Sequence, residues 1–190
     1  MPTEPLAREI LTFWFGTPPL VERDVWFRKD PAFDAAIRER FGDAVAAARA
    51  GAFGEWCRDP HGALARIVLL DQFTRNIYRN TPEAFSGDDR ALATADDAIA
   101  NGFDRKLAPL ERWFLYMPFV HSEDRVMQER AIALFHALAD ETGLSSPLEW
   151  AERHAEIIRR FGRFPHRNAI LGRASTTEEI AFLAAPGSTF

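Results

Sequence analysis

Apolar residues recur at helical spacing along most of this chain. Between positions 31 and 51 they fall three or four residues apart, on one face of an α-helix, as Phe33, Ile37, Phe41, Val45 and Ala48. Asp30-Pro31 before this stretch is typical of a helix start, and Gly51 after it is typical of a helix end. Since no segment alternates apolar and polar residues as a strand does, the pattern predicts an all-α protein.

Start and stop residues predict the remaining helices. The sequence places them from Pro60 to about Ile77, from Asp88-Asp89 to Asn101-Gly102, from Pro109, from a cap at Ser122 to Gly143, from the capping box Ser146-Pro147-Leu148-Glu149 to about Gly162, and after Thr176 or Thr177. Shorter helical pieces are expected at 5–15 and 52–57. The intervals between helix starts are unequal and show no 34-residue consensus. We therefore expect one all-α domain over 1–190, an irregular array of antiparallel helix pairs.

The predicted helix from 61 to 77 carries charge within an apolar sequence. Its apolar residues cover almost the whole circumference, which predicts a central, buried helix. Asp71 and Arg75 are spaced i, i+4, with the acid first, so they can pair along the helix. Gln72, Asn76 and Arg79 form a second polar strip. Because unpaired charges are costly to bury, this side either faces a ligand pocket or belongs to a closed structural network.

Arginine is unusually frequent and locally concentrated. The chain has 23 basic residues, of which only Lys29 and Lys106 are lysine, yet its net charge is −5. Residues 153–173 hold six arginines and one acid, a local charge of +5, so the other residues sum to −10. An arginine-rich loop over 159–168 suits a small anion such as a carboxylate or phosphate. Alternatively, these arginines cap helix ends and pair with acidic side chains.

Other functional classes have little support. A net-acidic chain is a poor general binder of nucleic acid. Cys57 is the only cysteine and no two histidines share an i, i+4 spacing, so neither a metal nor another cofactor is predicted. His154 lies on an apolar helix face and is expected to be structural, or a base only if a pocket reaches it. An apolar run of eight residues at 113–120 is too short to span a membrane, and the N-terminus lacks a secretory pattern. We expect a cytoplasmic protein that binds no membrane.

Three separated blocks carry a family resemblance. They are Leu69-Leu70-Asp71-Gln72-Phe73-Thr74-Arg75-Asn76-Ile77-Tyr78-Arg79, Tyr116-Met117-Pro118 to His121-Ser122-Glu123, and Phe161-Gly162-Arg163-Phe164-Pro165-His166-Arg167-Asn168. With Trp14-Phe15-Gly16 and Trp26-Phe27, they strongly resemble the bacterial domain-of-unknown-function family numbered 924. The resemblance implies an all-α fold similar to tetratricopeptide-like helical arrays, and it brings no established reaction or substrate.

The polar residues of these blocks define a candidate site. We expect one polar concavity, formed by Asp71, Gln72, Arg75, Asn76, Arg79, His121, Glu123, Arg163, His166, Arg167 and Asn168. In it Arg75, Arg163 and Arg167 would hold an anionic group, while Asp71 and Glu123 would orient the arginines. His121-Ser122-Glu123 is expected just before and inside the start of a helix, where anions are favoured.

Two functions fit this site. The first is a binding module for a small anionic molecule or an acidic peptide. The alternative is an enzyme that uses His121 or His166, with Asp71 or Glu123, for acid–base chemistry on an anionic metabolite. The sequence predicts neither a substrate nor an oligomeric state.

Overall fold

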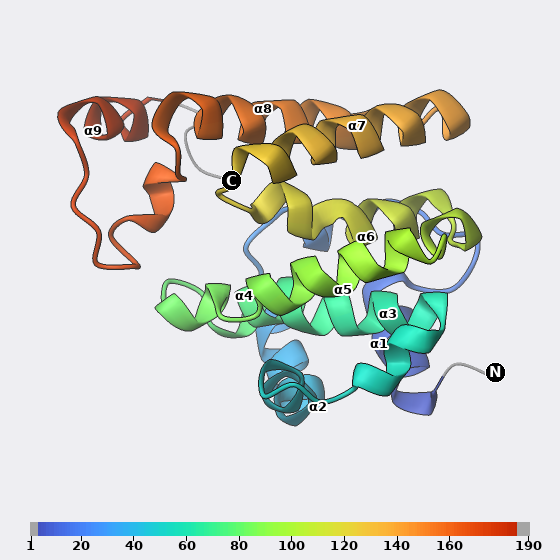
Figure 1. Ribbon diagram of the computed structural model, residues 1–190. Helices are drawn as coiled ribbons and strands as arrows, with labels where there is room; N and C mark the ends of the chain where they lie inside the picture. The colour runs from blue at the N-terminus through green and yellow to red at the C-terminus, as the bar shows by residue number, and fades with distance from the viewer. Residues whose placement is uncertain (1–3, 186–190) are drawn as a thin grey trace. The chain divides into compact units, whose positions relative to one another are not determined.

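Residues 4–185 fold into helices joined by short turns, in a computed structural model shown in Figure 1. This part of the chain contains no strand, which confirms the all-α prediction. The chain's contacts divide it into two compact units. Unit 1 comprises Met1–Arg79 and Glu83–Pro118, and unit 2 comprises Asn80–Pro82 and Phe119–Phe190. A single domain over 1–190 and a tetratricopeptide-like repeat stay predictions.

Unit 1 is built around one long helix. This helix runs through α3 (Pro60–Ile67), a π-helical segment (Val68–Phe73) and α4 (Thr74–Ile77). It contacts α1 (Pro5–Phe15), α2 (Pro31–Arg49) and α5 (Asp88–Ala100) of the same unit. Its apolar side chains are almost completely buried on all sides, as the sequence predicts for a central helix. The predicted piece at 52–57 is a short 3-10 helix, Gly54–Arg58.

The π-helical segment was not predicted, and it shapes the contact with α5. A π-turn widens the helix and changes which carbonyls are bonded, and here the hydroxyl of Thr74 donates to the carbonyl of Leu69 at 2.9 Å. Gly87, just before α5, lies so close that a Cβ there would stand 2.2 Å from the carbonyl oxygen of Leu70. The missing side chain therefore lets the N-terminus of α5 approach this helix and brings Asp88 to Arg75.

Unit 2 contains α7 (Arg125–Thr142) packed along α8 (Ser146–Phe161), followed by a 3-10 turn (Pro165–Arg167) and α9 (Thr177–Leu183). In Figure 1, α7 and α8 lie side by side over most of their length. Ile157, Ile158 and Phe164 form a small core, against which Phe161 and Phe182 pack. The helix α6 (Pro109–His121) begins in unit 1 and ends in unit 2.

Two predicted helix caps in unit 2 were wrong by one or two residues, and a third is confirmed. The cap of α7 is Asp124, whose carboxylate accepts from two backbone N–H groups of the first turn, and Ser122 lies outside the helix. Ser145, not Ser146, is the N-cap of α8, and its side chain makes no cap hydrogen bond. Thr176 caps α9 in a full capping box with Glu179. Asp124 caps α7 because its position places one carboxylate oxygen within reach of both N–H groups.

Over residues 4–185, no helix combines the length and the apolar character that a membrane crossing requires.

Candidate functional site

In unit 1, Arg75 lies between two aspartates. Its guanidinium donates to Asp71 Oδ1 at 2.9 Å and to both carboxylate oxygens of Asp88 at 2.8 and 2.9 Å. The Asp71 side chain is fully buried, whereas those of Arg75 and Asp88 are about one-fifth exposed. Burial by itself would lower the pKa of Arg75, but the two carboxylates outweigh it and raise that pKa. The i, i+4 pair that the sequence predicts is thus present, and Asp88 completes it.

The second polar strip of this helix converges on Asp34 of α2. Asn76 donates to Asp34 Oδ1 at 2.6 Å, and Arg79 donates to the same oxygen at 3.0 Å. Gln72 departs from this strip, because its amide donates to Asp71 Oδ2 at 2.6 Å. All five predicted site residues of unit 1 therefore belong to networks built on aspartate.

In unit 2, Glu123 binds the segment that follows α8. Its carboxylate accepts from Arg173 at 2.6 and 2.9 Å and from the backbone N–H of Phe164 at 2.8 Å. Burial opposes ionisation, but these hydrogen bonds prevail and lower the pKa of Glu123. The expectation that His121-Ser122-Glu123 opens a helix was wrong, since His121 is the last residue of α6 and α7 begins at Arg125. Glu123 thus ties the connection between these helices to the arginine-rich segment.

Arg163 pairs with a buried carboxylate of α9. It donates to Glu179 Oε1 at 2.6 Å and to Oε2 at 2.8 Å, and Glu179 is only 2% exposed. The hydrogen bond from Arg163 is the main reason that the pKa of Glu179 falls to about 2. Asn168 is buried as well, where it donates to Ser175 Oγ and accepts from Arg173 Nε, each at 3.0 Å. The arginine-rich segment is therefore fastened to α9 and to Glu123 by bidentate pairs.

A third group of unit 2 gathers nitrogen-bearing side chains at and beside the ring of Phe164. Arg167 lies over Phe164, with Cζ 4.6 Å from the ring centroid, and donates to the carbonyl of His121 at 2.9 Å. The centroids of His154 and His166 each lie 5.6 Å from that of Phe164, and His121 and His154 lie 6.3 Å apart. Four nitrogen-bearing side chains thus share a small volume.

His154 is buried at the centre of this group. Its Nδ1 lies 2.7 Å from the carbonyl oxygen of Trp150, so Nδ1 carries the proton. Burial, followed by the charges of His121, His166 and Arg167, lowers the pKa of His154 to about 3. The imidazole is therefore neutral at pH 7, and its surroundings are electropositive.

The structure brings the predicted residues together in two sets, one in each unit. Convergence of both sets on one concavity stays a prediction. The residues that complete the networks were missed as site members, namely Asp34, Asp88, His154, Arg173 and Glu179. The sequence offered a partial indication for some of them, because Arg173 belongs to the local excess of positive charge and Asp88 opens a helix.

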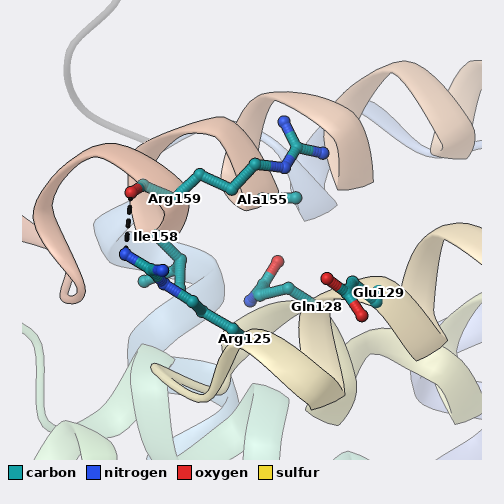
Figure 2. A pocket seen from close by; sticks show the side chains of 6 residues that line it. All are labelled: Arg125, Gln128, Glu129, Ala155, Ile158 and Arg159. Atoms are coloured by element: carbon teal, nitrogen blue, oxygen red, sulfur yellow. Dashed lines mark hydrogen bonds between the residues drawn. The ribbon is translucent and has the colours of Figure 1, made fainter.

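A small pocket lies between α7 and α8. Its volume is about 10 Å³, roughly enough for one water molecule. Figure 2 shows the six residues that line it, Arg125, Gln128, Glu129, Ala155, Ile158 and Arg159. Arg125 donates to the backbone carbonyl of Arg159 across it at 3.0 Å. None of the predicted site residues lines this pocket, and it is too small for a metabolite.

Metal chemistry gains no support from the described part of the chain. Among residues 4–185, no three histidine, cysteine, aspartate or glutamate side chains are grouped as ligands of one ion.

Comparison with known proteins identifies relatives without a known activity. No curated protein matches the chain. A solved structure of a protein of unknown function, ATU0120 from Agrobacterium tumefaciens, is similar to it, with 42% identity and a TM-score of 0.85 over 94% of this chain and 97% of the other. The sequence pattern of the bacterial proteins of unknown function called DUF924 matches residues 10–187. Since that match takes in nearly all of the chain, this protein belongs to the DUF924 family.

Proposed function

We propose that this protein binds a small anion at the histidine–arginine cluster of unit 2, formed by His166 and Arg167 beside Phe164 and by His121 beside His154. The observation that carries the proposal is that His154, His166 and the guanidinium of Arg167 lie around the Phe164 ring, with the His121 ring next to that of His154. Burial is the main cause of the lowered pKa of His154, and repulsion from His121, His166 and Arg167 lowers it further. An oxyanion placed among them would offset that repulsion and accept charge-assisted hydrogen bonds.

The proposed site is narrower than the set of residues chosen from sequence. Arg163 uses both arms of its fork on Glu179, and Arg75 is held between two aspartates. We assign these two arginines a structural part, in which they fix the backbone around the site. Glu123 has a similar part, because with Arg173 it orients the segment that carries His166 and Arg167.

The alternative of acid–base catalysis gains no support from the carboxylates. The lowered pKa of Glu123 keeps it ionised and excludes it as a general acid. As a base it is already engaged, because its carboxylate accepts from Arg173 and from the N–H of Phe164. Asp71 is committed to Arg75 in unit 1. Binding is therefore the function that we put forward.

The test measures the thermal stabilisation of the full chain by inorganic phosphate and by acetate. A ligand that binds only the folded state raises the melting temperature. His166→Gln is the informative variant, because this side chain is partly exposed and its loss should leave the fold intact. Losing one charge-assisted hydrogen bond costs about 1.5–3 kcal/mol, a roughly tenfold to hundredfold weaker affinity.

A matched control removes a positive charge from α8 outside the cluster. Arg159→Ala deletes a half-exposed guanidinium that pairs with Glu156 at 2.7 Å, and we expect it to respond to phosphate as the wild type does. Acetate and phosphate responses together distinguish a carboxylate ligand, such as an acidic peptide terminus, from a phosphorylated one. The proposal fails if neither anion stabilises the wild type, or if the control loses as much affinity as His166→Gln.

A further inference from the structure

A pair of guanidiniums lies over one ring in unit 1, beside the network built on Asp34. Arg38 and Arg49 are separated by about three turns of α2, so they point from the same side of that helix. Their Cζ atoms lie 5.9 and 4.7 Å from the centroid of the Tyr78 ring. Both side chains thus meet at the aromatic residue that follows α4.

Neither arginine has a carboxylate partner within residues 4–185. Asp34 is spaced i, i+4 before Arg38, an arrangement that favours an ion pair, but Asp34 is engaged by Asn76 and Arg79. Arg38 instead donates to the backbone carbonyl of Ile77. The Nε of Arg49 is buried and has no hydrogen-bond acceptor within the described residues.

This pair differs from the predicted site arginines of unit 1. Arg75 and Arg79 each bind aspartate, whereas Arg38 and Arg49 place two positive charges beside a neutral ring. The cation–π contacts hold the guanidiniums in place and provide only part of a counter-charge. A buried donor without an acceptor calls for an explanation, of which a bound ion is one.

We propose that Arg38 and Arg49 form a second anion site, which takes a small molecule with two linked phosphate groups. Guanidinium forks match phosphate oxygens in geometry and charge. Because the two Cζ atoms lie 5.9 and 4.7 Å from one ring centroid, they are at most about 11 Å apart, a separation that two joined phosphates bridge better than one. Tyr78 acts as the positioning residue, because its ring orients both side chains. This site does not depend on the cluster of His166 and Arg167, and it extends the protein's binding capacity to unit 1.

The experiment titrates the full chain with inorganic pyrophosphate in a calorimeter, and with orthophosphate for comparison. We expect pyrophosphate to bind more tightly than orthophosphate, and Arg38→Ala and Arg49→Ala each to weaken pyrophosphate binding by about tenfold or more. Arg49→Lys keeps the charge without the fork, so its affinity should lie between those of the wild type and Arg49→Ala. Circular dichroism checks that each variant is folded.

Arg40→Ala is the matched control, since Arg40 lies on the same helix, carries the same charge and forms an exposed pair with Glu9 at 2.8 Å. It should leave pyrophosphate binding within about twofold of the wild type. The inference is overturned if the wild type does not bind pyrophosphate, or if Arg40→Ala weakens binding as much as Arg38→Ala does. It is also overturned if His166→Gln alone abolishes pyrophosphate binding, a result that would leave the anion site of unit 2 standing.

Discussion

An arginine–carboxylate pair of unit 1 and one of unit 2 lie on different kinds of backbone. In unit 1, Asp71 and Arg75 lie on one continuous helix, and the acid is fully buried. In unit 2, Glu123 and Arg173 lie on connecting segments, and each side chain is about one-quarter exposed. A continuous helix limits the distance between two charged residues through their spacing in the sequence, whereas connecting segments bring together residues that no spacing rule relates. The first kind of pair should be costlier to break, because burial leaves the remaining charge without water.

Removing Arg75 should have the largest effect on folding. Arg75→Ala leaves the carboxylate of Asp71 buried without its cation, so we expect the free energy of unfolding to fall by about 3–5 kcal/mol. Urea denaturation at neutral pH measures this change. Asp71→Asn in the same background should recover part of the loss, since it removes the stranded charge. If the free energy of unfolding falls by less than about 1 kcal/mol, the unpaired carboxylate of Asp71 costs no more than the loss of an exposed ion pair.

Glu123→Gln tests the corresponding pair in unit 2. Glutamine keeps the shape and one acceptor oxygen but loses the charge that holds Arg173, so we expect a loss of about 1.5–3 kcal/mol. Glu156→Gln is the control, because Glu156 forms an exposed pair with Arg159, and such pairs contribute about 0–1 kcal/mol. If Glu123→Gln lowers the free energy of unfolding as much as Arg75→Ala does, the partial exposure of the pair in unit 2 does not make it less costly to break.

His154 should give unit 2 its own dependence on pH. The pKa of His154 falls to about 3 in the folded chain, against about 6.5 when unfolded. Above pH 6.5 both states are neutral, so His154 affects stability only below that pH, where the unfolded chain takes up a proton and the folded chain does not. The resulting loss is about 1.4 kcal/mol at pH 5.5 and grows until the pH nears 3.

The variant His154→Phe isolates this contribution. It keeps an aromatic ring that cannot titrate, so its stability should change less than that of the wild type between pH 7.5 and pH 5.5. Denaturation at both pH values, compared with His136→Phe as a control for loss of a histidine, measures the difference. Equal pH dependence in His154→Phe and the wild type would show that the buried imidazole takes up its proton over the same pH range as the unfolded one.

The helices, and the ion pair within a single helix, could be predicted from the sequence. The i, i+4 spacing of Asp71 and Arg75 predicts their contact, and the apolar circumference of that helix predicts its burial. The partners of Arg163 were beyond such reasoning, since Glu179 lies on another helix beyond an irregular segment. Helical periodicity predicts contacts between residues of one helix. It does not predict pairs that form when separate segments pack together.

The helix caps show a second limit. Ser122 and Asp124 are both good cap residues, and the sequence alone does not rank them. Asp124 is selected because its position allows its carboxylate to meet two N–H groups, while Ser122 accepts from the N–H of Asp124 itself. The shift matters for the candidate site, because it releases Glu123 from the helix and directs it to Arg173.

The π-helical turn at Val68–Phe73 also makes the fold sensitive to the number of residues in this segment. A π-turn holds more residues than an α-turn, so the side chains after it point in other directions than they would on a regular α-helix. Deleting one residue there would restore the regular winding, and it would rotate the following segment by about 100° relative to the preceding one. Arg75 would then turn away from Asp88, and Arg79 from Asp34. The number of residues in this turn therefore constrains the chain as firmly as their identity does.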